Sequence, residues 1–163
     1  MHRITEALLL SIAIAAPASA TATTSASATA RSVSSAIVSG TKYGANEDSK
    51  AGNAQIQCVQ RIPNDALADA VQGVIGSALS PAELTYLETF YASALGTRFV
   101  KAMADNIDPI KPFTDAQWKQ IKAVEDSPQQ AKLRKVTAVE NPKAAAAIGG
   151  ALKSLLDKCF NKT

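Results

Sequence analysis

Apolar residues recur with a period near 3.6 along most of the chain after residue 53, which is the pattern of amphipathic helices. The clearest helix start lies at Ser80, where a capping serine is followed by Pro81 and by Glu83. Proline suits the first position of a helix, and a glutamate three residues after the cap completes a capping box. The apolar residues that follow keep helical spacing: Leu84, Leu87, Tyr91 and Leu95.

Ser93 and Gly96 interrupt this apolar stripe, which then resumes at Phe99, Val100 and Met103. We therefore predict a helical hairpin over residues 80–103 with a tight corner at residues 93–96.

The rest of the region repeats the same start signals. Capping residues with a glutamine three positions later occur at Thr114 and Ser127, and Asn141 precedes a proline before the last apolar stripe. No alternating strand pattern and no Asn-Gly turn interrupts the helical pattern. The prediction is a single compact all-α domain of six to eight short helices over residues 53–163.

A shift of 34 positions places Ser80 over Thr114, Ser93 over Ser127 and Arg98 over Lys132. The apolar pairs that coincide are Leu84 with Trp118, Leu87 with Ile121 and Phe99 with Leu133. Two related helical hairpins are one explanation. The other is that any two capped helices share these features.

The beginning of the chain indicates export. Residues 1–20 combine Arg3, a short apolar run and the small-residue site Ala18-Ser19-Ala20, as a cleaved signal peptide does. Residues 21–52 are rich in Ala, Ser and Thr, with 15 such residues among the 19 from Thr21 to Ser39. Because this composition offers little large apolar surface, we expect a disordered leader, or a tether that displays the domain. The expected location is the periplasm.

The two cysteines, Cys58 and Cys159, lie near the ends of the predicted domain. In an exported protein they are most simply a disulfide. A reactive thiol is disfavoured because neither belongs to a Cys-x-x-Cys pair and the only histidine, His2, falls in the predicted signal peptide.

The sequence carries no catalytic constellation. Without histidine the mature chain lacks a Ser-His-Asp or Cys-His arrangement and the usual zinc ligands, so we expect no enzyme, no cofactor and no metal site. Glu83 and Glu88 could act as paired carboxylates, but Glu83 is better explained as a capping residue and Glu88 as part of a solvated face.

Charge is uneven along the chain. Residues 1–110 carry a net charge of −2 and residues 111–163 a net charge of +5, and the basic residues are densest at Lys132, Arg134, Lys135 and Lys143. Such a group could attract anionic lipid, cell-wall polymer or an acidic protein partner, for which we expect the face of Lys132, Arg134 and Lys135, or it could simply be a solvated helix surface. Nucleic acid is not expected as a partner, because the basic region lacks interleaved aromatic residues. No apolar run in the mature chain is long enough for a transmembrane helix.

One stretch has a family resemblance. The pattern Ser-Pro-x-Glu-Leu followed by Phe-Tyr-x-Ser-x-x-Gly-x-Arg resembles the bacterial family catalogued as domain of unknown function 2059. Its second half is carried by Phe90, Tyr91, Ser93, Gly96 and Arg98. The chain departs from the family at Ala94, where proline is common. The resemblance implies an exported helical protein and no particular activity.

These observations favour an exported protein of the cell envelope that acts by binding. The leading hypothesis is an inhibitor of a protein partner, such as an immunity protein that neutralises a toxin delivered into the periplasm. The alternative is a carrier of lipid or another envelope ligand, whose helices would enclose an apolar cavity.

Overall fold

The computed structural model describes residues 25–48, 51–105 and 111–161. The regular structure in these ranges is helical throughout, so the all-α prediction is confirmed. The helices are α1 (Ala28–Glu47), α2 (Asn53–Gln60), α3 (Ala68–Ala78), α4 (Pro81–Tyr91), α5 (Ala94–Ala104), α6 (Asp115–Glu125), α7 (Pro128–Thr137), α8 (Pro142–Ala144) and α9 (Gly150–Phe160). A π-helical segment, η1 (Ala145–Gly149), joins α8 to α9 into one continuous helix.

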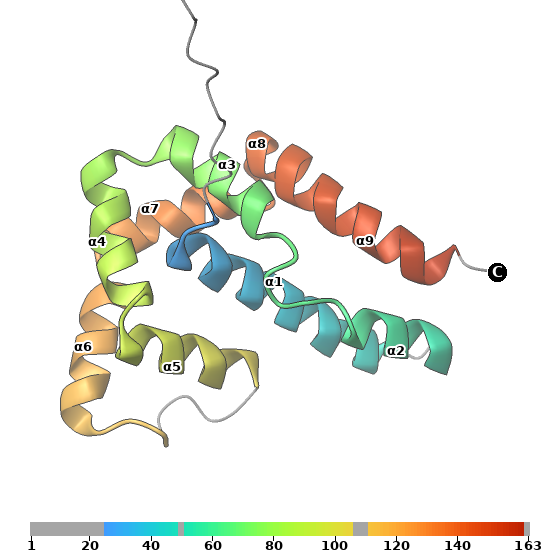
Figure 1. The fold of residues 1–163 in the computed structure, drawn as a ribbon, viewed down its shortest axis with the longest axis horizontal. Helices are drawn as coiled ribbons and strands as arrows, with labels where there is room; N and C mark the ends of the chain where they lie inside the picture. Colours follow the sequence, from blue (N-terminus) through green and yellow to red (C-terminus); the bar gives the residue numbers. More distant parts are fainter. Residues whose placement is uncertain (1–24, 49–50, 106–110, 162–163) are drawn as a thin grey trace, which may run out of the picture.

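Helix α1 is the centre of the fold (Figure 1). It contacts α2, α3, α4 and α5, and its residues Ala30, Ser34 and Val38 are almost completely buried. The prediction of a disordered leader over residues 21–52 is therefore wrong for residues 28–47. The folded domain also begins well before residue 53, because Ala26 already belongs to the core.

Helix α1 is buried through small side chains rather than large ones. The Ser34 hydroxyl donates to the backbone carbonyl of Asn64 at 2.8 Å and accepts from the backbone N–H of Leu67 at 3.0 Å. A buried hydroxyl with both roles satisfied costs little, and a small side chain lets the neighbouring backbone approach closely. A composition that offers few large apolar residues can thus still form a core helix.

The N-terminus of α1 is capped from a distant helix. Ser27 accepts from the Ala30 N–H, while the Glu88 carboxylate on α4 accepts from the backbone N–H groups of Ala28 at 2.8 Å and Thr29 at 2.9 Å. Glu88 also accepts from the Thr29 hydroxyl at 2.9 Å. The expectation that Glu88 lies on a solvated face is wrong, because its charge satisfies the free amides at the positive end of α1.

The two predicted hairpins are α4–α5 and α6–α7, and their helices begin at equivalent positions 34 residues apart. Helix α4 contacts α5 and α7, and α6 contacts α7 and α5. Each hairpin thus packs its two helices together, and the first helix of each hairpin contacts the second helix of the other. A twofold relation between the hairpins requires this arrangement. The aligned core residues Leu87 and Ile121 are both completely buried.

Two polar contacts between the hairpins are also equivalent under this twofold relation. Lys132 on α7 donates to Glu83 on α4 at 2.8 Å, and Arg98 on α5 donates to Gln117 on α6 at 2.8 Å. Lys132 aligns with Arg98, and Gln117 with Glu83, under the 34-residue shift. Both acceptors are also capping-box residues of their helices. These contacts support the interpretation as two related hairpins.

The predicted disulfide is confirmed. Cys58 on α2 and Cys159 on α9 are bonded, with their Cα atoms 5.5 Å apart and 101 positions between them in the sequence. In the chain-entropy account, closing a loop of this size stabilises the folded chain by up to ~4.7 kcal/mol.

Gly149 and Gly150 do not serve tight helix packing. A Cβ atom at either position would meet nothing within 4 Å, and both residues are exposed. Gly149 instead ends the π-helical segment, so a local break in the α-helical pattern accounts for the pair.

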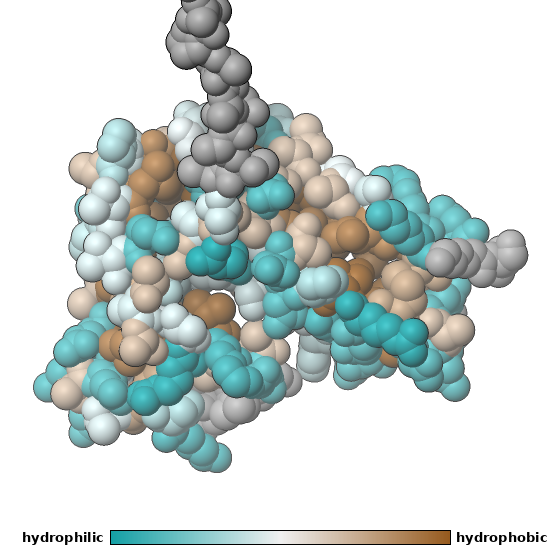
Figure 2. Space-filling view, in the orientation of Figure 1, coloured by the Kyte–Doolittle hydropathy of each residue, from teal (hydrophilic) through white to brown (hydrophobic). Residues whose placement is uncertain are grey.

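On the face shown in Figure 2, hydrophobic residues form small areas between hydrophilic ones. Within the described ranges, no helix has the length and apolarity needed to cross a membrane.

Candidate ligand-binding groove

A groove of about 350 Å³ lies where α1 meets the two hairpins. Its walls come from five helices: α1, α4, α5, α6 and α7. The lining residues are Ser32, Val33, Ala36, Ile37, Tyr91, Phe99, Val100, Met103, Ala104, Glu125, Gln130, Leu133, Arg134 and Thr137. This volume falls at the lower end of the range of small-molecule sites, which is about 300–1,000 Å³.

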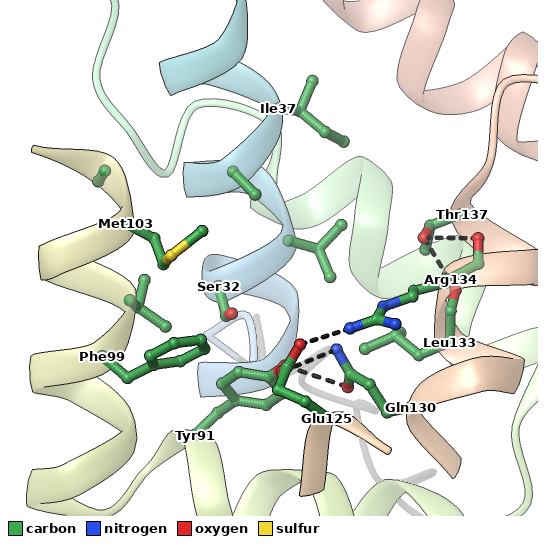
Figure 3. A pocket seen from close by; sticks show the side chains of 14 residues that line it. Ser32, Ile37, Tyr91, Phe99, Met103, Glu125, Gln130, Leu133, Arg134 and Thr137 are labelled. Carbon is green, nitrogen blue, oxygen red and sulfur yellow. Dashed lines mark hydrogen bonds and ion pairs between the residues drawn. The ribbon is translucent and has the colours of Figure 1, made fainter. Parts of the chain in front are cut away.

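Most of the lining is apolar. Figure 3 shows Phe99 and Met103 of α5 on one side, Leu133 of α7 on the other, and Ile37 of α1 between them. Phe99 and Leu133 belong to the buried core, whereas Met103 is 52% exposed. The groove is therefore a continuation of the core that opens to solvent near Met103.

Four polar lining residues lie together at one end of the groove: Tyr91, Glu125, Gln130 and Arg134 (Figure 3). The Glu125 carboxylate accepts from Gln130 Nε2 at 3.2 Å and from Arg134 Nη2 at 2.5 Å. The Tyr91 hydroxyl lies 3.3 Å from Glu125 Oε1 and 3.1 Å from Gln130 Oε1. The buried part of this end is thus a closed hydrogen-bond network.

Burial raises the pKa of Tyr91 above its ordinary value of 10.0, and the negative charge of Glu125 acts in the same direction. Tyr91 therefore stays protonated at neutral pH and serves as a hydrogen-bond donor.

The residues of the family pattern build the corner between α4 and α5. Ser93 caps α5, since its hydroxyl accepts from the Gly96 N–H at 3.0 Å and donates to the Phe90 carbonyl at 2.6 Å. A Cβ atom on Gly96 would lie only 2.1 Å from that same carbonyl oxygen. Among the pattern residues Phe90, Tyr91, Ser93, Gly96 and Arg98, only Tyr91 lines the groove.

Arg98 has a structural role outside the groove. Besides its bond to Gln117, its guanidinium lies 4.8 Å from the centre of the Phe113 ring, in a cation–π contact. This contact joins α5 to the segment that leads into α6.

Two of the three residues of the predicted basic face form ion pairs with acidic residues of this chain. Lys132 binds Glu83, and this hydrogen bond, with that from the Ser80 backbone N–H, lowers the pKa of Glu83 from 4.5 to about 2. Arg134 binds Glu125. Lys135 is exposed and forms no ion pair within the part of the chain that the structure describes. The use of Lys132, Arg134 and Lys135 as one partner-binding face stays a prediction.

Sequence patterns single out neither Glu125 nor Ser32, and they mark Gln130 only as a candidate capping-box residue after Ser127. The Gln130 side chain instead bonds Glu125 and Tyr91. Glu125 aligns with Tyr91 under the 34-residue shift. A twofold relation between the hairpins would bring these equivalent residues together near its axis. Gln130 follows the Ser127 cap. No such signal existed for Ser32, because it lies on the helix that composition alone did not predict.

Searches of the described residues find no cluster of three or more His, Cys, Asp or Glu side chains that could hold a metal ion. No family model, curated protein or solved structure matches this chain. The resemblance at Ser80 to Arg98 therefore stays a prediction.

Proposed function

We propose that this protein is an exported, non-enzymatic binding protein of the bacterial cell envelope that carries a small amphiphilic ligand in the groove between α1, α5 and α7. The observation that supports this function is the groove itself, with apolar walls and polar groups gathered at one end. Ligand sites in proteins commonly combine these two properties.

Two features agree with export. The first is the signal peptide expected over residues 1–20, which lies outside the described residues. The second is the Cys58–Cys159 disulfide, since structural disulfides persist in oxidising compartments such as the periplasm.

The groove supports binding better than catalysis. Tyr91 stays protonated, and the Glu125 carboxylate is engaged by Gln130 and Arg134. Neither group is poised to accept a proton from a substrate.

The inhibitor hypothesis would place an acidic protein on Lys132, Arg134 and Lys135. Lys132 and Arg134 already pair with Glu83 and Glu125, so an acidic protein would share both cations with acids of this chain. The groove combines apolar walls with a polar end, which supports the carrier function better.

The test is to purify the mature protein gently from the periplasm and to analyse it by native mass spectrometry. We expect a bound small amphiphile in the wild type, and its loss in Ala36→Phe, because Ala36 lines the groove and is exposed enough to accept a ring. Ala82→Phe is the matched control, since Ala82 is an exposed alanine on α4 outside the groove.

Binding of N-phenyl-1-naphthylamine, a fluorescent apolar probe, gives the same comparison in vitro. Equal binding by the two phenylalanine variants would contradict the carrier function. A protein retained in stoichiometric amount, with no small ligand, would favour the inhibitor instead.

A further inference from the structure

We infer that the preferred ligand is a single-chain amphiphile with a carboxylate headgroup, and that Arg134 contacts this headgroup at the polar end of the groove. A fatty acid is the simplest such molecule. This inference rests on the proposed function and adds the chemistry of the ligand to it.

The polar end of the groove holds hydrogen-bond donors that its own acceptors leave unused. Both oxygens of Glu125 already accept hydrogen bonds, Oε1 from Gln130 and Oε2 from Arg134. The Arg134 guanidinium has five N–H donors, and among the described residues it donates to Glu125 through Nη2. Its side chain is 61% exposed. The polar end therefore has spare donors, and a ligand that supplies acceptors would complement them.

Headgroups differ in how each would fit beside the existing hydrogen bond between Arg134 and Glu125. A carboxylate can bind the free edge of the Arg134 guanidinium, in the bidentate geometry that arginine favours, while the bond to Glu125 stays intact. An ammonium headgroup would have to share the Glu125 carboxylate with Arg134, Gln130 and Tyr91, and it would lie beside the positive charge of Arg134. A neutral hydroxyl would leave most guanidinium donors to water.

Anionic headgroups also differ in the size of their negative charge. A phosphate monoester carries a charge of about −1.5 to −2 at neutral pH, against −1 for a carboxylate. Because the headgroup would lie near the Glu125 carboxylate, the smaller charge is repelled less.

The apolar chain of the ligand would run from Arg134 toward Met103. Ile37, Val100 and Leu133 line this path. Met103 suits the open end, since its flexible thioether adapts to chains of different length.

The experiment measures displacement of bound N-phenyl-1-naphthylamine by decanoate, decanol, decylamine and decyl phosphate, which share one chain length. We expect decanoate to bind wild type about tenfold more tightly than decanol, a difference of roughly 1.4 kcal/mol. Decylamine and decyl phosphate should both bind more weakly than decanoate.

The decisive comparison is Arg134→Gln against Lys135→Gln, since both remove one positive charge from α7 and only Arg134 lines the groove. Arg134→Gln should abolish the preference for decanoate over decanol, and Lys135→Gln should keep it. Arg134→Lys, which retains the charge and a partner for Glu125, should keep only part of the preference. This variant also covers the case in which Arg134→Gln unfolds.

The outcomes distinguish failure of the carrier function from failure of the carboxylate inference. If no decyl compound displaces the probe, or the probe does not bind, the proposed function fails. If all four compounds displace it equally, or decylamine or decyl phosphate is preferred, the carrier function stands and the carboxylate inference is overturned. Equal behaviour of Arg134→Gln and Lys135→Gln would also overturn it.

Discussion

Single residues decide how α1 and the first hairpin are held. Glu88 caps a helix that lies 59 and 60 positions earlier in the sequence, at Thr29 and Ala28. Gly96 lets the first turn of α5 contact the end of α4, where any side chain would collide with the Phe90 carbonyl. In each case one side chain, or its absence, fixes the angle between two helices.

The Glu88 cap predicts a pH dependence of stability. Burial alone would raise the pKa of Glu88, but the backbone N–H groups of Thr29 and Ala28 and the Thr29 hydroxyl together lower it below 4.5. A carboxyl whose pKa is lowered in the folded state stabilises the fold fully above its unfolded pKa. That contribution is lost as the pH falls from there through the folded pKa.

We therefore expect Glu88→Gln to reduce the free energy of unfolding by about 1–2 kcal/mol at neutral pH. The difference in the free energy of unfolding between wild type and Glu88→Gln, the gap, should narrow as the pH falls below about 4.5. Urea unfolding followed by circular dichroism at several pH values measures this gap, and Glu83 contributes equally to both proteins. A gap that stays constant with pH would show that Glu88 acts through packing rather than charge.

Gly96→Ala tests the close approach at the α4–α5 corner. The added Cβ would lie 2.1 Å from the Phe90 carbonyl oxygen, so the corner must open, and we expect a destabilisation of about 1–3 kcal/mol. Gly73→Ala is the control, because Gly73 is an exposed α3 residue whose Cβ would meet nothing within 4 Å. Alanine should stabilise that position by up to about 1 kcal/mol. Similar thermal shifts for both variants would contradict the account of Gly96.

At the scale of helices, the sequence predicts features that depend on neighbouring residues. It does not predict features that depend on residues far apart in the chain. The caps at Ser80, Thr114 and Ser127 mark the true starts of α4, α6 and α7, because a cap and its amides lie within three residues of each other. Helix α1 was missed because its stability depends on Glu88, Asn64 and Leu67, which no local pattern connects to it.

The relation between the hairpins predicts the effect of one substitution. Gln117 occupies the place of Glu83, and Arg98 the place of Lys132, so Gln117→Glu should recreate the ion pair of the other half. We expect a stabilisation of about 0.2–1 kcal/mol, larger at low salt, since the pair is exposed.

A double-mutant cycle with Arg98→Ala separates the new ion pair from the favourable effect of any acid in the first turn of α6. The gain from Gln117→Glu should shrink when Arg98 is absent. An unchanged gain in that background would argue that the two contacts are not equivalent.

At the scale of the whole molecule, the groove forms where α1 crosses the two hairpins. Its lining comes from five helices, and its polar end joins Tyr91 of one hairpin to Glu125 of the other. The sequence could not predict such a site, because it depends on how helices far apart in the chain pack together. The disulfide joins α2 to α9, and neither helix lines the groove, so ligand binding and the covalent closure occupy separate parts of the fold.

The central claim, that this groove is the binding site, is tested most directly by methyl NMR during a titration with decanoate. Ile37 and Met103 line the groove, whereas Ile148 is buried in η1 away from it. We expect the methyl signals of Ile37 and Met103 to shift in a saturable way while those of Ile148 stay in place. Unchanged signals at Ile37 and Met103, or larger shifts at Ile148, would contradict the claim.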